Sequence, residues 1–228
     1  MICAMPVAQI ERFRVALADR TGLRFDGARL EFLSEVLQRR LTKLNVNADI
    51  YLWRLENAPP LNEWADLARE VTVGETYFFR NYEQFNALRE VVLPERVCVR
   101  RENVLRFLSA GCSTGEEAYS IAIIAREVIG DACRFEIIAA DLNPAALHGA
   151  ERARYSAWAL RETPADVRAR CFRREGKELV LDESIRGTVN FEAANLADAR
   201  CRKQPFIAHF APQYRADAGP AGKHHTHK

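Results

Sequence analysis

The sequence predicts an α/β protein in which a small all-helical region precedes a partial, open parallel sheet. Apolar residues recur at helical spacing through the first third, whereas short apolar runs alternate with helical stretches from Val104 onward. The order strand, helix, strand, helix, strand implies right-handed crossovers and a parallel sheet. The expected segments are a helical domain over 6–72, a linker with one helix over 73–102, an incomplete α/β domain over 103–198 and an irregular tail over 199–228.

Apolar stripes and breaking residues define the helices of the first part. The predicted helices contain Ile10–Leu17, Leu30–Leu44, Tyr51–Leu55, Asn62–Val71 and Phe85–Leu93. Gly22 can close the first, and Asp26 and Asn47 are candidate N-caps of the second and third. Pro94 is expected to stop the fifth because proline cannot continue a helix.

The α/β region contains three buried strand candidates separated by helices. The strands are expected at Val104–Ala110, Phe135–Ala140 and Thr188–Ala193, and the helices at Gly115–Ile129 and Pro144–Arg154. Asn143 is a candidate N-cap, with Pro144 at the first helical position. Leu179–Leu181 is interpreted as one arm of a small hairpin.

Composition and charge are those of a soluble globular protein. The chain has 228 residues, 48% of them hydrophobic, and a net charge of +2, too balanced to predict a nucleic-acid partner. The six cysteines form no C-x-x-C pair or zinc-ligand pattern, which predicts no metal site and a reducing, cytoplasmic location. The sequence contains no stretch of about 18 apolar residues, so no membrane-spanning helix is predicted. The final histidines, His224, His225 and His227, could bind metal, but an unstructured or vector-derived end is the favoured interpretation.

The first predicted strand ends in small residues, Ser109–Gly115, followed by Glu116 and Glu117 at the start of a helix. Small residues let the backbone approach a ligand closely, and a helix N-terminus offers free N–H groups. A phosphate site is one interpretation, but two carboxylates in the first turn would repel phosphate. A cationic ligand therefore fits this loop better.

The other two strand ends also carry polar side chains. Asp141 ends the second strand, where an acidic residue can accept hydrogen bonds from ribose hydroxyls. Asn195 and Leu196 follow the third, and an amide beside an apolar side chain suits the edge and face of an adenine. Taken singly, Glu117 and Asp141 could equally be helix-capping or surface acids. Their joint placement at successive strand ends favours a ligand site.

The segment Gly74–Asn81, before the sheet, contains Thr76, the pair Phe78–Phe79 and Arg80. Adjacent aromatic residues beside an arginine bury much apolar area around one charge. One interpretation is a hydrophobic anchor between domains with Arg80 as a surface cation, and the other is a functional arginine.

Four strings of residues carry a resemblance to a known family. They are VTVGETYFFR at 71–80, FLSAGCSTGEEAYSIA at 107–122, AADLN at 139–143 and FEAANL at 191–196. Together, in this order, they resemble the CheR-type protein-glutamate O-methyltransferases of bacterial chemotaxis receptors. The resemblance covers roughly residues 10–198.

The resemblance implies an all-helical domain followed by a Rossmann-like domain that binds S-adenosyl-L-methionine (SAM) at the junction of the two. The implied cofactor-binding residues are Thr76, Arg80, Glu117, Asp141, Asn195 and Leu196. Arg80 would also act at the reacting region, as the implied catalytic residue. Many members have Asn where this chain has Gly74, so a side-chain contact from that position is lost.

The implied partners are the cytoplasmic helices of chemoreceptors or related signalling receptors. A basic second helix of the family is thought to face this substrate, and it corresponds to the segment that carries Arg39, Arg40 and Lys43. A solvated helix face is an equally good interpretation of these three residues. The implied reaction is methyl transfer from SAM to a glutamate side chain, with S-adenosyl-L-homocysteine as the other product.

The sequence departs from the family after Leu196. The expected fourth-strand string FDxIxCRNxxIYF is absent, as are the later strands and the small β insertion that some members use to dock a receptor peptide. We interpret the sequence after about 198 as truncated or frame-shifted, and expect poor stability and no activity. The alternative function is a non-catalytic remnant or regulatory module, and a small-molecule methyltransferase is a weaker third possibility.

Overall fold

The computed structural model describes residues 5–60, 62–72, 74–99, 104–130, 134–196 and 208–210. The chain divides into two compact units, the first ending at Leu52 and the second beginning at Trp53. The division falls inside α3 (Ala48–Asn57). Helix α4 (Glu63–Val71) contacts α8 (Pro144–Arg152) of the second unit, so it does not group with the first helices as the predicted boundary at 72 implied. In the part of the chain that the structure describes, no helix combines the length and apolarity needed to cross a membrane.

The first unit is built from α1 (Val7–Thr21), η1 (Gly27–Arg29), α2 (Leu30–Leu44) and the start of α3. The buried hydrophobic residues of its helices are Ile10, Phe13, Leu17, Leu33, Val36, Leu37, Tyr51 and Leu52. Gly22 ends α1 in the left-handed conformation at φ 76°, as predicted. The Asn47 side chain accepts a hydrogen bond from the Ile50 N–H (2.9 Å) and caps α3, also as predicted. Asp26 instead precedes η1 and makes no side-chain cap.

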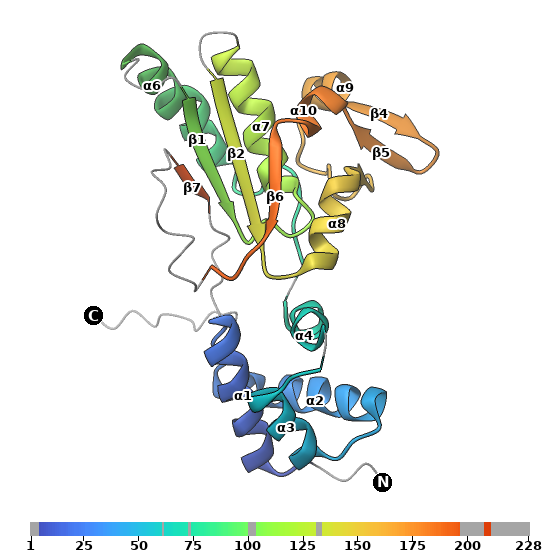
Figure 1. Ribbon diagram of the computed structural model, residues 1–228. Coiled ribbons are helices and arrows are strands. Elements are labelled where there is room, and N and C mark those ends of the chain that lie inside the picture. The colour runs from blue at the N-terminus through green and yellow to red at the C-terminus, as the bar shows by residue number, and fades with distance from the viewer. Residues whose placement is uncertain are drawn as a thin grey trace, which may run out of the picture. The chain divides into compact units, whose positions relative to one another are not determined.

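The second unit is organised around a parallel sheet with the order β6-β2-β1-β7 (Figure 1). Its strands are β1 (Val104–Ala110), β2 (Arg134–Asp141), β6 (Val189–Ala193) and β7 (Ala208–Phe210). The first three confirm the predicted strands, and the α/β class is confirmed. The spatial order reverses between β1 and β7, and ligands of such sheets bind at this kind of reversal, outside the carboxyl ends of the strands.

Strand β7 corrects the expectation of an irregular tail. It pairs in parallel with β1, with Phe107 opposite Ala208 and Ser109 opposite Phe210. A strand of three residues is too short to show alternating or continuous apolar character, so the residue pattern could not reveal it. Strand β1 is therefore paired on this side, although the expected fourth-strand string is absent from the sequence. The remainder of the tail, including its final histidines, lies outside the described residues.

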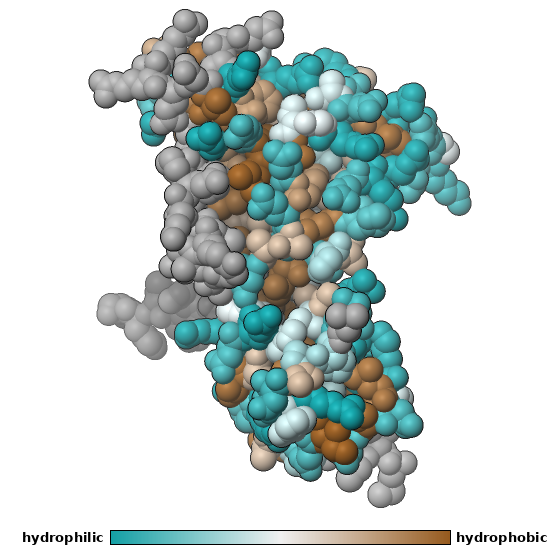
Figure 2. Space-filling view, in the orientation of Figure 1, coloured by the Kyte–Doolittle hydropathy of each residue, from teal (hydrophilic) through white to brown (hydrophobic). Residues whose placement is uncertain are grey.

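A second, antiparallel sheet has the order β3-β5-β4. Its strands are β3 (Arg154–Tyr155), β4 (Phe172–Glu175) and β5 (Glu178–Leu181), with α9 (Ala165–Cys171) and α10 (Glu183–Arg186) around them. The predicted hairpin arm at Leu179–Leu181 is confirmed as part of β5. An antiparallel sheet therefore lies between α8 and β6 in the sequence, where the residue pattern indicated only one hairpin arm. Strands of two to four residues give little periodic signal, so the sequence did not reveal the others. Hydrophilic residues dominate the surface over β4 and β5 (Figure 2).

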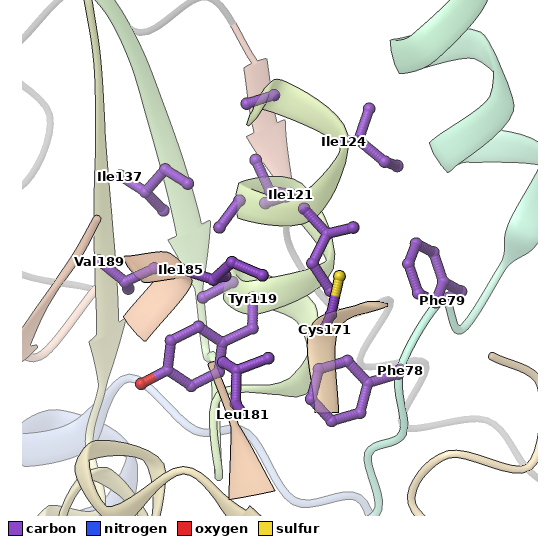
Figure 3. Close-up of a cluster of buried hydrophobic side chains, with 14 of the residues drawn as sticks. Phe78, Phe79, Tyr119, Ile121, Ile124, Ile137, Cys171, Leu181, Ile185 and Val189 are labelled. Carbon is purple, nitrogen blue, oxygen red and sulfur yellow. The ribbon is translucent and has the colours of Figure 1, made fainter. Parts of the chain in front are cut away.

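Helix α7 (Glu116–Ile129) joins the sheet to the other helices. It contacts β1, β2 and β6 as well as α5 (Tyr82–Ala87), α6 (Leu93–Val99) and α10. Its Ile121 and Ile124 belong to the same buried cluster as Phe78 and Phe79 (Figure 3). A helix that is buried on several sides is apolar nearly all round, which explains its composition.

The prediction that Pro94 ends its helix is wrong. Helix α5 continues through a π-helical stretch, η2 (Leu88–Val92), into α6, where Pro94 is the second residue. At the first turn of a helix the missing N–H costs no hydrogen bond. The π-helical stretch changes the hydrogen-bond spacing just before the proline, so the helix restarts there.

Candidate cofactor site

The strand register brings three predicted site segments to one edge of the parallel sheet. Gly111, after β1, donates its N–H to the Ala140 carbonyl of β2 (2.7 Å). Ala194, after β6, donates its N–H to the Asp141 carbonyl (3.0 Å). Asn195 and Leu196 follow directly, so the carboxyl ends of β1, β2 and β6 are adjacent, as the sequence predicted.

Three residues with positive φ shape the loop between β1 and α7. Gly111 has φ 77°, Ser113 has φ 49° and Gly115 has φ 90°. A Cβ at Gly115 would lie 2.8 Å from the Ala150 Cβ and 3.2 Å from the Phe191 Cζ. Glycine is required here both for its backbone conformation and for the space it leaves. The loop is therefore held close against α8 and β6.

Asp141 is 6% exposed and uses both carboxylate oxygens to organise this loop. Its Oδ2 accepts the Ser113 N–H (2.7 Å), and its Oδ1 accepts the Asn143 N–H (2.8 Å). Asp141 therefore has a structural role, which the sequence left open, because it binds two backbone N–H groups. Each carboxylate oxygen has a second lone pair, so a ligand hydroxyl can share the same group.

Glu117 carries a carboxylate inside the loop region. The Ser109 hydroxyl donates a hydrogen bond to its Oε1 (2.6 Å). Burial raises the pKa of Glu117 above its ordinary value, while the Ser109 hydrogen bond and the positive charge of Arg80 act in the opposite direction. A partly desolvated carboxylate is stabilised by a bound cation, which is the ligand charge that the sequence favoured.

Glu116 has a different role from Glu117. It is 4% exposed, and its Oε2 accepts a hydrogen bond from the Thr114 hydroxyl (2.7 Å). Burial raises its pKa as well. Its carbonyl accepts the Ser120 hydroxyl, whose oxygen in turn accepts the Phe79 N–H (3.0 Å). Glu116 therefore links the start of α7 to the aromatic segment before the sheet.

The aromatic segment combines the anchoring and the functional interpretations. The Phe78 ring lies 4.8 Å from Tyr155 and 5.0 Å from Phe172 in edge-to-face contacts. The next residue, Phe79, has φ 59° and turns the chain so that Arg80 is exposed. The Arg80 Nη1 donates to the Glu75 carbonyl (2.6 Å), and its charge acts on Glu117. The anchored rings thus place an arginine beside the half-buried Glu117 carboxylate.

Gly74 and Ser113 bring the aromatic segment and the β1–α7 loop together. A Cβ at Gly74 would lie 3.6 Å from the Ser113 Oγ. That Oγ is buried and has no hydrogen-bond partner in the described part of the chain. A buried hydroxyl without a partner costs free energy, so it is a ready contact for a polar ligand. Thr76, two residues after Gly74, is half-buried in the same segment.

The predicted substrate-facing residues lie on α2 in the first unit. Arg39 and Lys43 line a shallow depression, and the Arg39 guanidinium lies 3.7 Å from the Glu35 carboxylate. Arg40 is only 2% exposed, so its assignment to the same open face is wrong. Its position one residue after Arg39 turns it about 100° around the helix, and such neighbours do not share a face.

Some site residues were not recognised from the sequence. Ser109 holds Glu117, and Ser113 contacts Asp141 through its N–H. Both lie in the small-residue stretch, so their proximity to the strand end was the available signal. The Tyr155 hydroxyl donates to the Thr114 carbonyl (2.8 Å) from a separate sheet, and no local pattern pointed to it.

The fold and these side chains define a cofactor-binding α/β domain. Its edge holds carboxylates, an unpartnered hydroxyl and small residues, which fit a cationic ligand that also bears hydroxyls and an adenine. Residues 74–208 match the family model described as "CheR methyltransferase, SAM binding domain". The match extends ten residues beyond the end of the predicted resemblance, to the start of β7.

Three relatives illustrate the similarity. "Chemotaxis protein methyltransferase 2" of Vibrio cholerae is 31% identical over 191 residues, covering 81% of this chain and 66% of its own length. The protein of the same name from Pseudomonas aeruginosa is 31% identical over 196 residues, covering 83% and 68%. "Probable biofilm formation methyltransferase WspC" of P. aeruginosa is 29% identical over 188 residues, covering 82% of this chain but 44% of its own length.

The chain belongs to the CheR methyltransferase family, and its cofactor is SAM. It spans about half to two thirds of the length of the relatives described above.

Proposed function

We propose that the chain transfers the SAM methyl group to glutamate side chains of chemoreceptors or related signalling receptors. The observation that carries this proposal is the exposed Arg80, fixed by the Glu75 carbonyl and close enough to Glu117 for its charge to act on that carboxylate. The Arg80 guanidinium is suited to an incoming anion, and the Glu117 carboxylate is suited to a cation. The names of the chemotaxis relatives support receptors as the substrate class.

The residues of the chain would hold the two reactants rather than move a proton. A bound SAM supplies a methyl group on a positively charged sulfonium. Glu117 and Asp141 bind and orient the cationic and hydroxyl-bearing parts of the cofactor, with Thr76, Asn195 and Leu196 as further contacts. Arg80 orients the substrate glutamate by a charge-assisted hydrogen bond. That glutamate is already ionised at neutral pH, so no general base is required.

The proposed partner surface on the first unit is the exposed part of α2. Arg39 and Lys43 line the same shallow depression on α2, and we propose that an acidic receptor helix contacts it. Rim charges of this kind act mainly on the rate of association and on its salt dependence.

The test is methyl transfer from labelled SAM to receptor-containing membranes, with release of volatile methanol by alkali. Carboxyl methyl esters are cleaved by alkali, whereas methyl groups on nitrogen are retained. We expect alkali-labile label with the parent chain and a rate at least about a hundredfold lower with Arg80→Ala, because misplaced reactants lose much of the benefit of orientation. Arg80→Lys is the matched control, since it keeps the charge but not the fork of donors.

An unchanged rate in folded Arg80→Ala would show that Arg80 is only a surface cation. Alkali-stable label would contradict a glutamate as the acceptor. A parent chain that binds SAM and transfers no methyl group would favour the non-catalytic alternative.

A further inference from the structure

Arg161 lies between two aromatic rings on the surface of the second unit. Its guanidinium carbon is 3.6 Å from the centre of the Tyr77 ring and 4.3 Å from that of Trp158. Its Nη1 also donates to the Trp158 carbonyl (3.0 Å). Among the described residues, the Arg161 guanidinium contacts two aromatic rings and a carbonyl oxygen rather than a carboxylate. We call Tyr77, Trp158 and Arg161 the stacked surface.

The stacked surface rests on a rigid base. The turns over 156–163 are closed by backbone hydrogen bonds such as Arg161 N–H to the Trp158 carbonyl (3.2 Å). Leu160 in the same turns is fully buried, and the Arg168 guanidinium donates to its carbonyl. The Phe78 N–H donates to the Ala159 carbonyl (2.9 Å) and ties these turns to the aromatic segment. A partner would therefore meet groups that are already ordered, at a low entropic cost.

The stacked surface is continuous with the proposed reacting region. Tyr77 precedes the anchored Phe78 and Phe79, and the Arg80 guanidinium lies 5.8 Å from the centre of the Tyr77 ring. One tyrosine ring therefore contacts the cation of the stacked surface and lies near the cation that the proposed function assigns to the substrate glutamate. A protein segment held at Arg80 would extend over its immediate surroundings.

The chemistry of the surface matches an acidic protein segment. Trp158 is 70% exposed, which is unusual for so large an apolar side chain held by an ordered turn. Trp, Tyr and Arg are the residue types that dominate binding energy at protein interfaces. Arginine stacked on aromatic faces keeps its edge N–H groups for carboxylates. Isolated exposed aromatic residues are common, but here two of them hold one arginine.

We propose that Tyr77, Trp158 and Arg161 form a docking surface for the acidic protein segment that carries the reacting glutamate, contacting carboxylate-bearing residues that flank it. This inference rests on the proposed function. It assigns substrate recognition to the second unit, next to Arg80, in addition to the basic helix of the first unit.

The test uses the whole chain with the variants Trp158→Ala, Arg161→Ala and Arg161→Lys. We expect KM for the receptor to rise about fivefold to thirtyfold in both alanine variants, the range of an interface residue that contributes strongly. The kcat at saturating receptor and the Kd for SAM should stay at parent values. Arg161→Lys should be intermediate, because lysine keeps the charge but not the planar stacking group. Trp53→Ala, which removes another exposed tryptophan (57%), is the matched control and should leave KM unchanged.

A second readout separates this inference from the proposed function. Binding of a soluble receptor cytoplasmic fragment is measured without turnover, by calorimetry at two salt concentrations. Weaker binding by Trp158→Ala and Arg161→Ala supports the docking surface even if the parent transfers no methyl group, an outcome that would sink the proposed function alone. Parent-like binding and KM in folded alanine variants, or losses equal to those of Trp53→Ala, would overturn the docking surface. Thermal melts establish which variants are folded. If an alanine variant does not fold, binding and KM of Arg161→Lys still test the docking surface.

Discussion

Glu117 illustrates how a single half-buried carboxylate can affect both stability and cofactor binding. Its charge is costly without a ligand because burial disfavours the ionised form, and the Ser109 hydroxyl and Arg80 offset only part of that cost. Since its pKa in the folded chain is raised, its contribution to stability is most favourable below the ordinary glutamate pKa and is lost as pH rises through the raised value. A cationic cofactor would reverse this penalty at neutral pH.

Glu117→Gln should therefore separate the two effects. The amide oxygen can still accept the Ser109 hydrogen bond, so we expect a higher melting temperature than the parent at pH 7 without SAM. The advantage should shrink as pH falls through the raised pKa of Glu117 and vanish below about 4.3, where the parent carboxyl is neutral in both the folded and the unfolded chain. SAM affinity should drop roughly tenfold to a hundredfold, since hydrogen bonds to charged groups contribute about 1.5–3 kcal/mol.

Melting curves from pH 4 to 8 and SAM titrations of the same preparations check this prediction. A lower melting temperature for Glu117→Gln at every pH would mean that the ionised carboxylate is already well compensated in the cofactor-free chain. Parent-like affinity would place SAM elsewhere.

At the scale of residues, the sequence indicated positions better than contacts. Asp141 could be placed at a strand end from the apolar run before it, but its bond to the Ser113 N–H depends on a loop conformation with positive φ. Arg40 was misjudged because composition shows that a helix is basic and does not show which cations its rotation buries.

Among the elements, the β1–α7 loop has the strictest steric requirement. Gly115→Ala introduces both left-handed strain and a Cβ 2.8 Å from the Ala150 Cβ. Gly176→Ala, at φ 62° with nothing within 4 Å, introduces the strain alone and is the matched control. We expect Gly115→Ala to destabilise the chain by about 1–3 kcal/mol more than Gly176→Ala, the cost of overpacking. If urea unfolding shows equal losses of stability for Gly115→Ala and Gly176→Ala, the loop relaxes enough to accommodate the added Cβ.

Long elements were predictable and very short ones were not. Helix α7 and strands β1 and β2 have seven or more residues with a clear apolar pattern. Strands β3 and β7 have two and three residues, and they form because neighbouring strands offer backbone partners. Pro94 was misread because its effect depends on the preceding π-helical stretch, which sequence periodicity does not reveal.

For the whole molecule, β7 changes the expected consequence of the unusual tail. Its pairing covers backbone groups of β1 at Phe107–Ser109 that would otherwise form a sheet edge. Unpaired edges favour association with other chains. The expectation of instability therefore depends on whether this short strand persists in solution.

Chains ending at Leu196 and at Phe210 test this dependence. The longer one keeps β7, so we expect it to melt like the 228-residue chain. The shorter one should melt about 2–8 °C lower, equivalent to roughly 1–2 kcal/mol in a chain of this size, and should associate as concentration rises. Identical melting and sedimentation of the two would contradict a stabilising role for β7.

SAM is expected to bind at the carboxyl edge of the parallel sheet, and calorimetric titration measures this binding. We expect saturable binding of one SAM by the 228-residue chain, with most affinity lost in Asp141→Ala. Asn143→Ala is the control, because it removes the cap bonds to Ala145 and Ala146 at the start of α8 while leaving the carboxylate in place. It should bind SAM like the parent despite a stability loss of about 1 kcal/mol. A folded parent chain that binds no SAM, or an Asp141→Ala chain with parent affinity, would rule out a SAM site that depends on Asp141 at this edge of the sheet.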